Sequence, residues 1–154
     1  MRKISVDNLF NYLDQIDNEK SQTQKYYNKT LKENYNFSKL SLYKYLEPFS
    51  IELFKFLKTK NTENKIYKIL SNLLLKIYFN LNIGYNNYHI QEKIKNYELA
   101  RENSSKIQAI FFLLYSLNEI NENENNYFQE QINDIIVSIG SLIKSIEKKE
   151  DKDD

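Results

Sequence analysis

The spacing of apolar residues near the C-terminus constrains the fold more than any other feature of this chain. Between Phe128 and Ile146 these residues recur at three- and four-residue intervals, which places them on one face of an α-helix. The stripe consists of Phe128, Ile132, Ile135, Ile136, Ile139, Leu142, Ile143 and Ile146. Because such a stripe must be covered by other elements, the pattern predicts helix-on-helix packing.

Few chain breakers interrupt the remaining sequence. Only two glycines and one proline occur among 154 residues, a composition that favours long helices over tight turns. The proline, Pro48, falls within a predicted helical segment at 39–59. Since proline is tolerated in the first turn of a helix and kinks it elsewhere, this segment is either one kinked helix or two helices, the second beginning at Pro48.

Helical spacing predicts two more core helices. One runs from a cap at Thr62 to Gly84, where a glycine followed by Tyr-Asn-Asn-Tyr is typical of a C-terminal cap and loop. The next extends from about Ile90 to Leu117, and the polar run 121–126 separates it from the last helix. The fold class that we predict is all-α, an up-down four-helix bundle with an N-terminal helical extension.

The chain divides into three predicted regions. Residues 1–38 form a helical extension and connector, with an amphipathic helix that starts near residue 5. Residues 39–147 form the bundle. Residues 148–154 form a charged tail, which we expect to be frayed.

Apolar surface in two helices exceeds what one stripe requires. The segments Leu73–Phe79 and Ala109–Tyr115 are hydrophobic around much of the helix, which favours a homo-oligomer over a deeply central helix. Gly140 raises a separate question, because an interior glycine costs a helix about 1 kcal/mol: either a neighbour approaches closely there or the residue is an accident. The predicted oligomer interface consists of Phe111, Phe112, Leu113, Ile139, Gly140 and Ile143.

The sequence offers few parts for catalysis. Cysteine is absent, His89 is the single histidine, and no Glu-x-x-His pair or phosphate-binding glycine loop occurs. Five carboxylates in and beside the polar loop could hold a divalent cation, namely Glu119, Glu122, Glu124, Glu130 and Asp134. A solvated surface is the better interpretation of them. We therefore predict no catalytic residue, no metal and no cofactor. An enzyme built on Glu119 or Glu122 is the minor alternative.

The sequence shows neither the pattern of a secretory signal nor that of a membrane-spanning segment. The N-terminal basic pair is not followed by an apolar stretch, and the longest apolar run, 109–115, is far shorter than the roughly 20 residues that span a bilayer. We expect a cytoplasmic protein without a membrane partner.

Positive charge is concentrated in the middle of the chain. The net charge is only +1, yet the segment Lys20–Lys76 holds 12 lysines against 4 glutamates. Lys65, Lys68, Asn72 and Lys76 are spaced to share one helix face, and Lys55, Lys58 and Lys60 precede them. Such a face can follow a phosphate backbone, so these six lysines are the predicted nucleic-acid-binding residues. A merely solvated helix face is the alternative.

Three segments together resemble a known family. They are Tyr43-Lys-Tyr-Leu-Glu-Pro48, Ala100 with the run 107–117, and Tyr127 with the glycine-bearing run 132–145. In these segments residues 40–146 resemble the small four-helix-bundle proteins that include Avd, the accessory variability determinant of diversity-generating retroelements, and proteins encoded by intervening sequences of bacterial 23S rRNA genes.

The resemblance implies an accessory protein that is not a catalyst. Members of this family assemble as a five-subunit barrel, bind nucleic acid through basic surfaces and associate with a reverse transcriptase. Gly140 would then lie where a neighbouring helix passes too closely for a side chain. This chain departs from the family in its near-neutral charge and two arginines, and in the segment Lys58–Lys68, which lacks the family's proline-x-x-arginine-like turn. Residues 1–38 lie outside the resemblance.

The functional expectation is therefore an oligomeric bundle, for which the resemblance implies five subunits, that binds RNA or DNA as a reverse-transcriptase accessory subunit. The main alternative is a helical protein–protein interaction module of a phage or mobile element, in which the lysines serve only solubility.

Overall fold

The computed structural model describes residues 37–60 and 63–153. Contacts divide the chain between Asn36 and Phe37, and the second unit, which extends to Asp154, is the one described below. The predicted amphipathic helix near residue 5 and the predicted cap at Thr62 lie outside the described residues.

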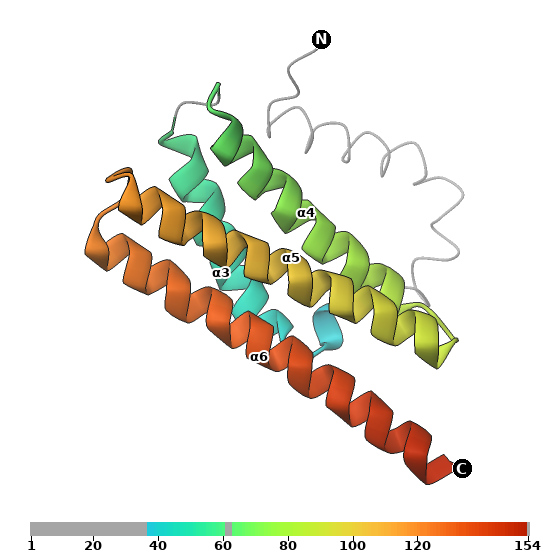
Figure 1. The fold of residues 1–154 in the computed structure, drawn as a ribbon. Helices are drawn as coiled ribbons and strands as arrows, with labels where there is room; N and C mark the ends of the chain where they lie inside the picture. Colours follow the sequence, from blue (N-terminus) through green and yellow to red (C-terminus); the bar gives the residue numbers. More distant parts are fainter. Residues whose placement is uncertain (1–36, 61–62, 154) are drawn as a thin grey trace, which may run out of the picture. The chain divides into compact units, whose positions relative to one another are not determined.

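The second unit consists of helices alone across its described ranges. Its elements are η1 (Phe37–Lys39), α3 (Tyr43–Lys58), α4 (Lys65–Tyr85), α5 (Ile90–Ser116) and α6 (Glu122–Asp153). The four α-helices alternate in direction along the chain (Figure 1). The predicted all-α, up-down four-helix bundle is thus confirmed.

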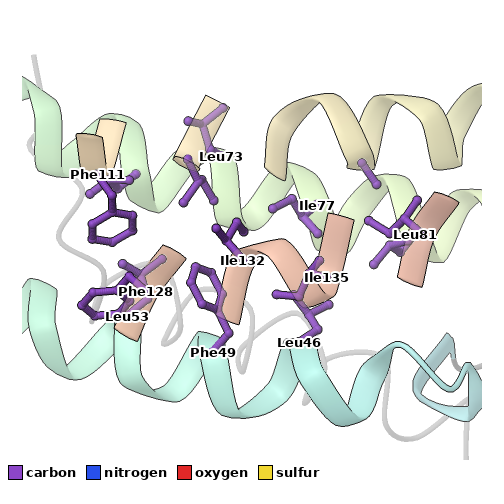
Figure 2. Packing of buried hydrophobic residues seen from close by; sticks show 14 of the residues in the cluster. Leu46, Phe49, Leu53, Leu73, Ile77, Leu81, Phe111, Phe128, Ile132 and Ile135 are labelled. Atoms are coloured by element: carbon purple, nitrogen blue, oxygen red, sulfur yellow. The ribbon is translucent and has the colours of Figure 1, made fainter. Parts of the chain in front are cut away.

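All four helices contribute apolar side chains to a single core. Leu46 and Phe49 of α3 point toward Ile135 and Ile132 of α6, and Leu53 of α3 lies beside Phe128 (Figure 2). The opposite wall is formed by Leu73, Ile77 and Leu81 of α4 and by Ile107 and Phe111 of α5. At one end the rings of Phe111 and Phe128 stack, with centroids 4.4 Å apart. The apolar positions that predicted the helices are therefore the ones that hold them together.

The central helix of the bundle is α5, which has extensive contacts with both α4 and α6. Small residues make this close packing possible, since Ala100 and Ser104 are fully buried. The Ser104 hydroxyl donates to the carbonyl of Ala100 at 2.8 Å, so its burial leaves no unpaired hydroxyl. By contrast, α3 contacts α4 only sparsely, because aromatic side chains such as Phe56 and Tyr67 fill the space between these two helices.

Residues 39–59, for which two arrangements were open, contain one continuous helix. Pro48 lies inside α3 rather than at its start. Its ring nitrogen cannot donate to the preceding turn, and the Ser50 hydroxyl donates to the carbonyl of Leu46 at 2.6 Å in the same region. The bundle also begins earlier than the predicted boundary at residue 39, because Phe37 is buried and contacts Tyr43 and Tyr78 edge-on.

Side-chain and backbone caps fix the helix ends. Asn64 is the N-cap of α4, and its side chain accepts from the amide of Ile66. At the end of α5, Asn118 adopts φ 59°, and the amide of Glu119 donates to the carbonyl of Leu114 at 2.9 Å. This is a Schellman motif with asparagine in the place that glycine usually takes.

The polar run after α5 is partly helical. The amide of Asn121 donates to the Glu124 carboxylate, and the amide of Glu124 donates to the Asn121 side chain, a reciprocal capping box. At the other end, the charged tail that we expected to be frayed continues α6 to Asp153. There, the Gln91 side chain donates to the carboxylate of Glu150 at 3.1 Å, which ties the tail to the start of α5.

The surroundings of the two glycines differ from what the sequence suggested. Among the described residues, only the guanidinium of Arg101 lies near Gly140, 3.6 Å from where its β-carbon would be, so no described helix of the same chain passes too closely. A close approach by another copy of the chain stays a prediction. Gly84, predicted as a C-terminal cap, lies within α4, and its φ is not positive. A β-carbon there would stand 2.8 Å from the ring of Tyr97. The close approach therefore occurs between α4 and α5.

Candidate nucleic-acid interface

The outward face of α4 carries the predicted lysine stripe. Lys65, Lys68, Asn72 and Lys76 are all exposed. A helix rises about 1.5 Å per residue, so the three lysines extend over about 16 Å along the axis. None of the ion pairs between residues that the structure describes includes one of these lysines. The three charges are therefore available to an external anion.

Negative charge is missing from α4. Its 21 residues include three lysines and no aspartate or glutamate. Two of the lysines, Lys65 and Lys68, lie in the first turns, where the partial positive charge of the helix end opposes a cation. Local helix stability would favour acidic residues at these positions. The positive charge of this exposed face therefore does not serve the local stability of the helix.

The lysines of α3 have local contacts instead. Lys55 pairs with Glu52 at 3.5 Å, and Lys58 lies over the ring of Phe54 at 4.7 Å from its centroid. Lys60 follows the helix, is half-buried over Phe56 and donates to the carbonyl of Glu119 at 3.3 Å. Of the six predicted lysines, those of α4 thus form one open face, while Lys60 serves the packing of the α5–α6 turn.

Two exposed apolar residues extend the lysine stripe and were not among the predicted site residues. Phe79 and Ile83 follow Lys76 by three and seven residues, and each is 52% exposed. At about 100° per residue these positions lie on the same face of α4 as the lysines. The sequence signal was available, because the three-residue step from Lys76 to Phe79 continues the spacing of the stripe.

The interface predicted between copies of the chain is only partly on the surface. Phe111 and Ile139 are fully buried and Ile143 is 3% exposed, so these three side chains belong to the core of the chain itself. Their assignment to an oligomer interface is wrong because α5 and α6 use them against each other and against α3. Phe112 and Leu113 are exposed, at 57% and 47%, and Gly140 is half-buried.

The candidate carboxylates take part in separate local contacts. Glu119 accepts from the Tyr67 hydroxyl at 3.3 Å, and Glu124 belongs to the capping box. Burial of Tyr67, reinforced by the charge of Glu119, raises the pKa of the tyrosine. His89, which precedes α5, is exposed and makes no side-chain cap. Within the described ranges, no three His, Cys, Asp or Glu residues gather as a metal site would require.

The junction between α4 and α5 lies at the C-terminal end of the helix that carries the lysine stripe. The Lys93 ammonium donates to the carbonyls of Gly84 and Tyr85 at 2.7 and 2.9 Å, which closes the C-terminus of α4 with a cation. Partial burial lowers the pKa of Lys93. Burial, with a smaller effect of Tyr85, raises the pKa of Tyr97 to about 12. This junction holds the half of α4 that carries Phe79 and Ile83 firmly against α5.

Across the part of the chain that the structure describes, no helix is both long and apolar enough to cross a membrane. No protein-family model, curated protein or solved structure matches the chain.

Proposed function

We propose that this chain is a non-catalytic, nucleic-acid-binding helical bundle that acts as an oligomeric accessory subunit of a reverse transcriptase of the diversity-generating retroelement type. The nucleic-acid part of the proposal is supported by the open lysine face of α4. The reverse-transcriptase part rests on the resemblance of residues 40–146 to Avd-like proteins.

The observation that carries the proposal is the absence of acidic residues from α4 together with three exposed lysines that form no ion pair with another described residue. A phosphate backbone is the common polyanion that presents a line of charges to such a face. Lysines on a helix contact phosphates without reading sequence, because their ammonium groups act as flexible point charges. Binding through this face is therefore expected to be strong at low salt and indifferent to base sequence.

A salt series tests this proposal directly. Electrophoretic retardation of RNA and DNA should weaken as salt rises, with a log–log slope of about −2 to −3 if the three lysines of one chain each contact a phosphate. Absence of retardation at low salt, or retardation that salt does not weaken, would defeat the nucleic-acid assignment.

Self-association is supported by the apolar residues that the bundle leaves uncovered on α5. Phe112, Leu113 and Leu117 are each close to half exposed, although they lie beside buried residues of the same helix. Sedimentation of the wild-type chain should show an oligomer, and Phe112→Glu combined with Leu113→Glu should convert it to a monomer. A wild-type monomer across the micromolar range would contradict this part of the proposal.

The second candidate function is a helical protein–protein interaction module of a phage or mobile element without nucleic-acid binding. The same exposed patch on α5 favours it, because apolar surface of this kind also accepts a different protein. Co-purification from the native host separates the two. The proposed function predicts a reverse transcriptase encoded near this gene and recovered with the chain, whereas its absence from both would favour the interaction module.

A further inference from the structure

The lysine stripe of α4 runs without interruption into an exposed aromatic ring. Phe79 is 52% exposed and lies one helical turn beyond Lys76. Lys65 and Phe79 are separated by about 21 Å along the axis, so a short segment of nucleic acid can contact both ends of the face. Exposure of a phenylalanine ring to water is unfavourable. Because this ring lies at the end of a cationic stripe, a ligand with both phosphates and flat apolar surfaces would fit the whole face.

We infer that the ligand of the α4 face is a single-stranded nucleic acid, with a base stacked on the Phe79 ring while the lysines contact the phosphates. This inference rests on the proposed function and specifies its ligand.

The distinction between single strand and duplex follows from where the bases lie. In a duplex the flat faces of the bases are stacked on one another, and the convex face of α4 would meet only phosphates and sugars. A single strand can turn its bases outward onto an aromatic side chain, a contact that tolerates any sequence because every base has a flat π face. Asn72, between the lysines of the stripe, adds a neutral donor and acceptor that suits a base edge.

A second copy of this chain is a less suitable occupant of the same face. In a two-fold symmetric contact the same patch meets itself, which would bring the lysines of one α4 close to those of the other. Among the described residues, α4 itself offers no carboxylate that could compensate this repulsion. The charge of the face therefore favours a polyanion over self-association.

The test compares one oligonucleotide as a single strand and as a duplex by fluorescence anisotropy at fixed salt. The wild-type chain should bind the single strand more tightly. Phe79→Leu keeps an apolar side chain without the ring, and it should weaken single-strand binding about 5- to 100-fold while leaving duplex binding unchanged.

A matched control removes an exposed aromatic ring elsewhere. Tyr127 is 41% exposed near the start of α6, beside Glu124 and Glu130, where negative charge repels phosphates. Tyr127→Leu should leave both affinities unchanged. Circular dichroism melting of both variants verifies that they remain folded.

The outcomes separate this inference from the proposed function. Equal binding of single strand and duplex, with no effect of Phe79→Leu, would overturn the inference and leave nucleic-acid binding in place. Equal losses on both forms would also overturn it, as would a change of oligomeric state in Phe79→Leu, which would assign the ring to a contact between copies. Binding of neither form by the wild-type chain would remove the proposed function itself.

Discussion

The two helices that flank α5 bury similar apolar stripes and present opposite charges to the solvent. In α4 the exposed face carries lysines and no acidic residue, whereas α6 carries eight acidic residues against four lysines. Both helices pack against α5 extensively. Core packing therefore does not explain the charge of either outer face.

The glycines of α4 and α6 also differ in how closely a neighbouring helix approaches them. Each flanking helix has one, but only Gly84 of α4 lies where a β-carbon would collide with a neighbour, the buried ring of Tyr97. Gly140 of α6 has ordinary space beside Arg101. The α4–α5 contact is thus tight and specific, while the α5–α6 contact tolerates change near its glycine. The free energies of unfolding of variants at the α4–α5 and α5–α6 contacts test this difference.

The largest expected effect is alkaline destabilisation on the α4 side. Burial raises the pKa of Tyr97 to about 12, above its ordinary value of 10.0, because the folded chain favours the neutral phenol. The resulting stability is complete below pH 10 and is lost as pH rises toward 12, up to about 3 kcal/mol. Denaturant titrations at pH 9 and 12 measure it.

Tyr97→Phe serves as the control for that experiment, because it keeps the ring and cannot ionise. Its loss of stability between the two pH values should be smaller than that of the wild type. Other tyrosines, such as Tyr43 with a pKa that burial raises to about 12, contribute equally to both proteins. Identical losses in the two proteins would show that Tyr97 does not titrate differently in the fold.

Gly84→Ala should give the next effect. The new methyl group would stand 2.8 Å from the buried Tyr97 ring, so overpacking is expected to cost about 1–3 kcal/mol, more than the roughly 1 kcal/mol that alanine gains in a helix. Chemical denaturation measures the change. A more stable Gly84→Ala variant would mean that the close approach of α4 and α5 is not as described.

Lys93→Ala tests the cation at the same junction. Removing the ammonium takes the Lys93 donor from the carbonyls of Gly84 and Tyr85, of which Gly84 keeps the amide of Asn87 at 3.2 Å, and the expected loss is about 1–2 kcal/mol. Lys95→Ala on the same helix is the control, since Lys95 is exposed and should change stability little. Equal effects of the two substitutions would remove the capping role of Lys93.

Gly140→Ala should have the smallest effect and the opposite sign. A methyl group there meets only the Arg101 guanidinium at 3.6 Å, an ordinary contact, so the helix should gain up to about 1 kcal/mol. Thermal unfolding measures the gain. Destabilisation would mean that a neighbour lies close to Gly140 and that the two glycines do not differ in this respect.

Sequence periodicity was sufficient for the helices and insufficient for the contacts between them. The spacing of residues such as Ile132, Ile135 and Ile139 identified a buried stripe, because helical geometry alone determines which residues share a face. Which glycine meets a ring depends on the register between two helices. That register is set by long-range contacts, so spacing alone does not reveal that Gly84 is the glycine that meets a ring of a neighbouring helix in the same chain.

The candidate site shows the same limit. The exposure of Lys65, Lys68 and Lys76 agrees with their predicted place away from the apolar face. The position of Lys60 over Phe56, and its hydrogen bond to the turn after α5, depend on residues distant in sequence. Phe111, Ile139 and Ile143 were assigned to an oligomer interface because an apolar residue on a stripe can face either the core of its own chain or another copy.

The most direct test of the central claim, that the outward face of α4 is a phosphate-binding surface, is a matched pair of charge reversals measured by anisotropy at low salt. Lys65, Lys68 and Lys76 of α4 are changed to glutamate in one variant, and Lys144, Lys148 and Lys149 of α6 in the other. Both variants alter the net charge equally. We expect the α4 variant to remain folded and to lose binding at least tenfold more than the α6 variant. Equal losses, or undiminished binding by the α4 variant, would show that the outward face of α4 does not bind phosphates.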